Sequence, residues 1–152
     1  MKANSPANEL LGNDILEKII RPKIGLLPLY IELYDTVAPE KREKFESFLH
    51  TIINEIRKRN IDVVEAPVCR VKDEFSNAIR LFEDEQVNAI VTLHLAYSPS
   101  LESADILAST ELPIIILDTT PSYEFGSNQN PDDIFFNHGI HGLQDMCNLL
   151  IR

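Results

Sequence analysis

Two histidines, His138 and His141, lie three residues apart in the segment NHGIHG near the end of the chain. On a helix this spacing places two imidazoles on one face, where they can chelate a divalent cation. Histidine rings also have a simpler use, because their nitrogens hydrogen-bond to loop carbonyls or line a wet surface. We expect this simpler use here, with His138 and His141 as wall residues of a polar site.

A third histidine, His94, lies at the end of the apolar run NAIVTLHL. In that setting a histidine is more often a buried core residue with satisfied hydrogen bonds than a metal ligand, and we expect the former. A metal site built from His94, Asp118 and the histidine pair would need all of them to converge. No complete metal site is therefore predicted within this chain.

Polar side chains follow four apolar runs of the sequence, in the loops 29–39, 67–72, 95–100 and 118–130. In an open parallel sheet, ligands bind outside the carboxyl ends of the strands, near the point where the strand order reverses. Aromatic rings stack on sugar faces and carboxylates accept hydroxyl protons, so these loops suit a neutral polyhydroxylated ligand. The same composition is common in loops that bind nothing. The polar residues are Tyr30, Glu32, Tyr34, Asp35, Arg70, Tyr97, Ser98, Ser100, Asp118, Thr119, Thr120, Ser122, Tyr123 and Glu124.

Several other chemistries fit the sequence poorly. None of the five glycines forms a GxGxxG or Walker loop, and no serine lies on a GxSxG turn. Receiver-type phosphoacceptor chemistry would need a lysine after the fourth apolar run, and none follows. Cys69 and Cys147 have apolar neighbours, so we expect reduced structural thiols, with a single disulfide between them as the alternative. The formal charge of −10 repels nucleic acid and anionic lipid surfaces at long range.

The apolar runs at 23–31, 61–67, 88–95 and 113–118 alternate with helical patterns. Nearly continuous runs are typical of strands covered on both faces, and strands separated by helices pair in parallel through right-handed crossovers. The sequence therefore predicts an α/β fold. We expect a flavodoxin-like or Rossmann-like open parallel sheet of about four strands flanked by helices.

Apolar residues at helical spacing mark the segments between these runs. A helix is predicted to begin near Pro39, a second lies within 71–87, and a third covers 100–110 with Ser100 as its N-terminal cap. A helix over 13–20 is expected to end at Pro22. The stripes of the first two are Phe45, Phe48, Leu49, Ile52, Ile53 and Ile56, then Phe75, Ala78, Ile79 and Phe82.

At 152 residues the chain has the size of one domain. We expect a single α/β domain over 1–152, with an N-terminal helical extension over 1–21 and a closing helix over 137–152. No stretch approaches the ~20 apolar residues of a membrane span, and the start lacks the apolar region of a signal peptide. A cytoplasmic protein with no membrane partner is expected.

Two segments, IVTLHLAYSPSLESADILASTELPIIILDTTPSYEF and FFNHGIHGLQDMCNLL, resemble the N-terminal domain of the L-fucose and L-arabinose isomerase superfamily. In that family a strand ending in His and an aromatic-Ser-Pro turn, here 94–99, precedes a helix. A strand with a polar turn, here 113–122, and an Asn-x-x-x-His-Gly segment, here 137–142, then lead into another helix. The likeness covers 23–152, and the order and spacing of the motifs are more specific than any single motif.

The resemblance implies an aldose–ketose isomerase. In such enzymes a divalent metal, usually manganese, polarises the sugar carbonyl while paired acids move protons between C1 and C2. The metal ligands and acid–base carboxylates of the family lie in the domains that follow this one. The resemblance therefore implies no catalytic residue and no metal ligand in this chain, which is expected to be inactive alone. It implies as partners a small sugar, further catalytic domains or neighbouring subunits, and a homo-oligomer.

Carried over by position, the resemblance implies substrate-binding roles for His141, His138, Tyr97, Ile31 and Leu33. His141 and His138 match polar positions that face the sugar, and Tyr97 matches the aromatic of the Ser-Pro turn. Ile31 and Leu33 match the loop after the first strand. His138 replaces the glutamine expected in arabinose isomerases, so the sugar stays undefined.

The closing helix is interpreted as the bridge to a second domain. Its apolar stripe is expected to remain unpaired and to favour self-association. The alternatives are a free-standing sugar-binding or assembly module without catalysis, and an α/β domain without a ligand. The stripe consists of Ile140, Leu143, Met146, Cys147 and Leu150.

Overall fold

The structure is a computed structural model, and it describes residues 21–124 and 126–152. The helix expected over 13–20 lies outside the described residues. Within them, every helix is too short or too polar to cross a lipid bilayer. The elements in chain order are β1 (Lys23–Leu29), α2 (Glu32–Val37), α3 (Arg42–Arg57), β2 (Asp62–Glu65), α4 (Lys72–Asp84), β3 (Ala89–His94), α5 (Ser100–Ser109), β4 (Ile114–Leu117), α6 (Ile134–Asn137) and α7 (Gly139–Ile151), with 3-10 turns at Pro39–Lys41 and Pro131–Asp133.

All four strands are parallel, in the order β2-β1-β3-β4, which confirms the predicted α/β fold with an open sheet. Each strand lies within its predicted apolar run and is shorter than that run by a few residues. The strand order reverses between β1 and β3, whose last residues Leu29 and His94 lie side by side. This reversal is where a ligand site is expected in such a sheet.

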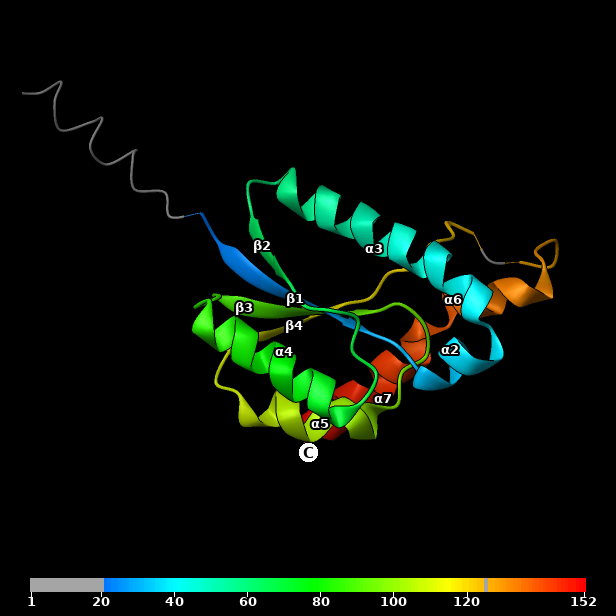
Figure 1. The fold of residues 1–152 in the computed structure, drawn as a ribbon. Helices are drawn as coiled ribbons and strands as arrows, with labels where there is room; N and C mark the ends of the chain where they lie inside the picture. The colour runs from blue at the N-terminus through cyan, green and yellow to red at the C-terminus, as the bar shows by residue number, and fades with distance from the viewer. Residues whose placement is uncertain (1–20, 125) are drawn as a thin grey trace, which may run out of the picture.

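Helices cover both faces of the sheet (Figure 1). One face packs against α3 and α6, through a core that includes Phe45, Leu93 and Phe136. The other face packs against α4, α5 and α7, through a core that includes Phe82 and Met146. The apolar stripe predicted for the second helix is wholly buried in α4, and the stripe of α3 is buried or packed against the core.

The closing helix does not leave its apolar stripe unpaired. It lies against α5 and the end of β3, its Met146 is fully buried, and Leu150 packs against the core below the sheet. None of the five stripe residues is exposed. The expectation of an open apolar stripe was therefore wrong, because α5 lies close enough to cover it. The exposed apolar residues of this helix are Leu149 and Ile151 instead.

Ser100 is not the cap predicted for the third helix. The capping position of α5 is Pro99, which offers no side-chain cap, and Ser100 is the first residue inside the helix. Its hydroxyl instead donates a hydrogen bond of 3.2 Å to the carbonyl of Gly142 on α7. Ser100 thus joins two helices rather than ending one.

Candidate functional site

Four aromatic rings gather at the carboxyl edge of the sheet, beside the reversal of strand order. Tyr34 comes from α2 after β1, and Tyr97 from the loop after β3. His138 occupies the N-cap position of α7 without a capping hydrogen bond from its side chain, and His141 lies in the first turn of that helix. The rings of Tyr97 and His138 are nearly parallel with centroids 6.3 Å apart, and the rings of His138 and His141 lie 6.2 Å apart. We call these four residues the ring cluster.

Hydrogen bonds define the tautomers of both histidines. Nδ1 of His138 lies 2.5 Å from the carbonyl oxygen of Ile134, so this nitrogen carries the proton and donates it. Nε2 of His138 is then an acceptor, and the Tyr34 hydroxyl, 3.0 Å away, donates to it. Nδ1 of His141 likewise donates to the carbonyl of His138, at 3.2 Å. Both histidines therefore bond to backbone carbonyls, as expected from the sequence, although the partner of His138 lies at the start of α6 rather than in a loop.

This pairing leaves acceptor atoms at the surface of the cluster. In the described part of the chain, the Nε2 atom of His141 has no hydrogen-bond partner, and His141 is exposed. The Tyr34 oxygen has lone pairs that remain after its proton is donated to His138. An aromatic wall with such acceptors can bind hydroxyl groups of a neutral ligand.

Tyr34 is held in place by neighbouring rings. Its ring makes edge-to-face contacts with Phe135, at 5.0 Å between centroids, and with Tyr30, at 6.0 Å. Burial against these rings raises the pKa of the Tyr34 hydroxyl above its usual value. The hydroxyl therefore stays protonated at neutral pH and remains a donor to His138.

The short helix α2 that carries Tyr34 has no buried residues of its own, and ion pairs anchor it. Asp35 accepts from Arg42 of α3 at 3.2 Å and from Arg70 of the β2–α4 loop at 2.8 Å. Arg70 also pairs with Glu74, which accepts the backbone N–H groups at the start of α4. These partly buried charges form a network rather than an isolated surface pair, so they can hold α2 against the sheet.

Two glycines let α7 approach the end of β3. A Cβ atom at Gly139 would lie 2.7 Å from the carbonyl oxygen of His94, and one at Gly142 would lie 2.8 Å from the carbonyl oxygen of Ser98. Such distances are too short for a side chain, so glycine is required at both positions. This close contact places His138 and His141 next to Tyr97.

His94 lies beneath this contact and is only 4 % exposed. Neither of its ring nitrogens has a hydrogen-bond partner within the described structure. The expectation of a satisfied core histidine was therefore half right: the ring is buried, but it is unsatisfied. Burial lowers its pKa to about 4, so the ring is neutral at pH 7. Among the described residues, the hydroxyls of Tyr30, Thr92 and Ser98 are buried without partners as well.

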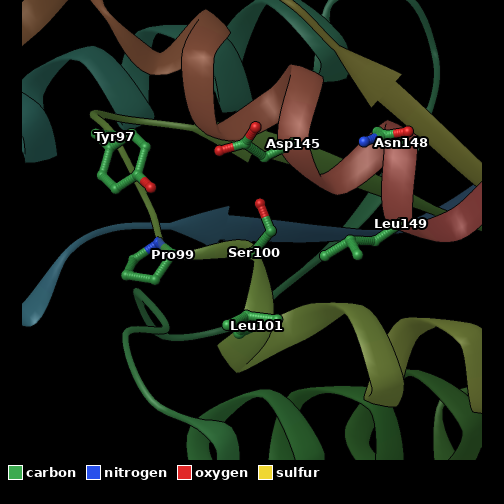
Figure 2. Close-up of a pocket in the computed structure, with 7 residues that line it drawn as sticks. All are labelled: Tyr97, Pro99, Ser100, Leu101, Asp145, Asn148 and Leu149. Atoms are coloured by element: carbon green, nitrogen blue, oxygen red, sulfur yellow. The ribbon is translucent and has the colours of Figure 1, made fainter.

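A hollow of about 280 Å³ opens beside the ring cluster (Figure 2). Tyr97 belongs to both, because its ring stacks on His138 and also lines the hollow. Asp145 and Asn148 of α7 supply a carboxylate and an amide to its wall. The remaining lining residues are Pro99, Ser100, Leu101 and Leu149.

The structure places the five residues implied by the resemblance in two groups. Tyr97, His138 and His141 lie together in the ring cluster. Ile31 is the residue that precedes α2, and it is partly buried. Leu33 is 55 % exposed and lines a separate hollow with Asp35 and Arg70.

Potential metal ligands and thiols can be located in the described part of the chain. There, no group of three or more His, Cys, Asp or Glu side chains is arranged to hold a metal ion. Burial raises the pKa of Cys69 to about 12, so its thiol is protonated and unreactive. Both cysteines are free thiols.

Sequence reasoning did not single out Tyr34, although it is the hydrogen-bond partner of His138. Tyr34 was one of many polar residues in the strand-end loops, and nothing in its spacing marks it. The feature that could have identified Tyr34 is its position just after β1, because this places it at the same carboxyl edge of the sheet as the histidines. The unsatisfied state of His94 depends on the close approach of α7, which no local pattern reveals.

No model of a known protein family matches the chain, and no curated protein matches it either. The fold, the ring cluster and its hydrogen bonds are therefore the observations that bear on function.

Proposed function

We propose that this chain is the substrate-pocket domain of a metal-dependent aldose–ketose isomerase that acts on sugars resembling L-fucose or L-arabinose. The observation that carries the proposal is the ring cluster, in which three of the residues implied by the resemblance lie together beside the strand reversal. The two fixed imidazole tautomers and the protonated Tyr34 leave the cluster with acceptors for sugar hydroxyls. Its aromatic faces suit the apolar side of a sugar ring.

In this proposal the chain binds and orients the sugar but does not convert it. Following the resemblance, we assign the metal and the acid–base carboxylates to other domains or to neighbouring subunits. The ring cluster lies at an open edge of the sheet, where a second protein surface can close over it. Assembly into a homo-oligomer belongs to the same proposal.

Sugar binding to the full chain tests the proposal. The imidazole NMR signals of His138 and His141 are followed while L-arabinose, L-fucose or D-glucose is added. We expect the first two sugars to shift these signals in the millimolar range, because only half of a pocket is present. His141→Ala should lose the response of His138, whereas His50→Ala, at an exposed position on α3, should retain it.

An isomerase assay with manganese and the same sugars provides the second measurement. We expect no turnover by this chain alone. Robust turnover would refute the assignment of catalysis to other domains. Absence of any shift at His138 and His141 with every sugar would refute the pocket itself.

A further inference from the structure

The two histidines of the ring cluster are held in the same way. In each of them Nδ1 donates to a backbone carbonyl, at 2.5 Å for His138 and at 3.2 Å for His141. Histidines that bind metal ions are usually held like this, because a carbonyl bond at one ring nitrogen fixes the ring and leaves the other nitrogen free of a proton. The nitrogen that is left for an ion is Nε2 in both residues.

The Tyr34 hydroxyl lies at a distance from His138 that suits two ligands of one ion. Its oxygen is 3.0 Å from Nε2 of His138, and it donates its proton to this nitrogen. A first-row divalent ion binds nitrogen and oxygen ligands at about 2.0–2.2 Å. Two atoms that are 3.0 Å apart can both lie at this distance, with an angle of roughly 95° at the ion.

The separation of the two imidazole rings fits the same ion. An ion bound to Nε2 lies roughly 3.2 Å from the centroid of that ring, so two rings on opposite sides of one ion have centroids about 6.4 Å apart. The centroids of His138 and His141 are 6.2 Å apart. His141 is exposed, so its ring has room to turn towards an ion.

This arrangement of ligands favours one class of metal. Two imidazoles on opposite sides of an ion, with an oxygen near a right angle to them, form part of a tetragonal set of nitrogen and oxygen ligands. Divalent copper and nickel prefer such a set, whereas manganese prefers a set made of oxygens. The affinity of nitrogen ligands also rises from manganese to nickel and copper.

We propose that His138, His141 and Tyr34 bind a divalent ion of the copper and nickel class, through the two Nε2 atoms and the tyrosine oxygen. The ion takes the place of the proton that Tyr34 donates, and this proton is released to the solvent. With two histidines and a tyrosine, the site differs from a group of three His, Cys, Asp or Glu side chains, which the described residues do not form. Sugar binding is not needed for this site, so the inference does not rest on the proposed function.

Calorimetric titration of the untagged full chain with Ni²⁺ at pH 8 tests the two histidines. We expect one ion to bind per chain, and His141→Ala to weaken binding at least about tenfold. The matched control His50→Ala removes an exposed histidine from α3 and should bind Ni²⁺ like the unchanged chain. Mn²⁺ should bind at least about tenfold more weakly than Ni²⁺.

The number of protons released tests the role of Tyr34. Burial raises the pKa of the Tyr34 hydroxyl, so at pH 8 it keeps its proton until an ion binds, whereas an ordinary histidine is already neutral. Binding heats in two buffers of different ionisation enthalpy should show one proton released per Ni²⁺ by the unchanged chain. Tyr34→Phe should release none and bind more weakly.

Three results would overturn the proposal. The first is equal affinity for Ni²⁺ in His141→Ala and the unchanged chain, with circular dichroism showing that both are folded. The second is equal proton release by Tyr34→Phe and the unchanged chain. The third is binding of Mn²⁺ as tight as that of Ni²⁺, since oxygen ligands would then hold the ion.

Discussion

His94 shows how close packing of a helix determines the state of one side chain. The approach of Gly139 and Gly142 encloses the ring without offering either nitrogen a partner. A neutral imidazole tolerates this burial far better than a charged one, so its pKa falls to about 4. The unfolded chain binds a proton at about pH 6.5, where the folded chain does not.

The free energy of unfolding is therefore expected to depend on pH. Because His94 binds its proton more weakly in the folded state, its contribution to stability is complete above pH 6.5 and is lost as the pH falls towards 4. We expect a loss of roughly 2 kcal/mol between pH 7 and pH 5 from this group. Urea unfolding at the two pH values measures it.

His94→Leu should remove this part of the pH dependence, since it replaces an unsatisfied ring by an apolar side chain of similar size. His50→Leu is the matched control, because His50 lies exposed on α3 and its replacement should leave the pH dependence intact. An unchanged difference between pH 7 and pH 5 in His94→Leu would show that other groups cause it.

At the residue scale, the sequence predicted side-chain interactions with backbone atoms a few residues away. It did not predict interactions with residues that are distant along the chain. The carbonyl bonds of His138 and His141 were expected, because histidine ring nitrogens commonly hydrogen-bond to nearby backbone carbonyls. The role of Ser100 was misjudged, since its partner Gly142 lies 42 residues further along the chain.

At the scale of elements, the contact between α7 and β3 depends on the two glycines. Helix propensity alone predicts that Gly142→Ala stabilises α7 by up to about 1 kcal/mol. The added methyl group, however, would lie 2.8 Å from the Ser98 carbonyl oxygen and 2.9 Å from its nitrogen, and backbone atoms cannot move aside as a flexible side chain can. We expect a net destabilisation of about 1–3 kcal/mol in urea unfolding.

Gly126→Ala is the control for this substitution, because nothing lies within 4 Å of a Cβ atom placed there. Its free energy of unfolding should remain within about 0.5 kcal/mol of the unchanged chain. A Gly142→Ala protein as stable as Gly126→Ala would show that α7 does not approach β3 so closely.

The strands and the longer helices were predictable because each has its own pattern of apolar residues in the sequence. The strands follow from nearly continuous apolar runs, and α3 and α4 follow from apolar stripes that the structure buries or packs against the core. The helix α2 was missed within the loop 29–39, since its six residues include none that is buried. Ion pairs from Arg42 and Arg70 stabilise it instead, and their partners are known only from the fold.

At the scale of the whole molecule, the sheet that the described residues form has two central strands and two edge strands. Every residue of β3 and all but the first of β1 are buried, whereas the edge strands β2 and β4 have no buried residue. Strands in the centre are covered on both faces and on both edges. Their hydrogen bonds are expected to open only when the whole domain unfolds.

Amide hydrogen exchange followed by NMR tests this order. We expect the amides of Leu26, Ile90 and Val91 to be at least about tenfold more protected than those of Ile115 and Ile116. Equal protection of all these amides from exchange would contradict the assignment of β4 as a partly buried edge strand.

The topology could be inferred from the sequence, since parallel strands joined by helices allow few arrangements. The ring cluster could be inferred only in part, because the strand reversal indicates where a site lies but not which side chains meet there. The meeting of Tyr34 with His138 joins residues 104 positions apart, and it depends on how α2 and α7 are both held.

The composition and exposure of the edge strand β4 also affect how molecules of this protein associate. It consists of three isoleucines and a leucine, and its Ile115 is 52 % exposed. Within the described ranges 21–124 and 126–152, it has a neighbouring strand on one side only. Natural sheets usually protect such an edge with a lysine, a proline or a bulge within the strand, and β4 has none of these. When heat or high concentration brings many molecules together, this bare edge is the place where one molecule can add to the next and start a fibre.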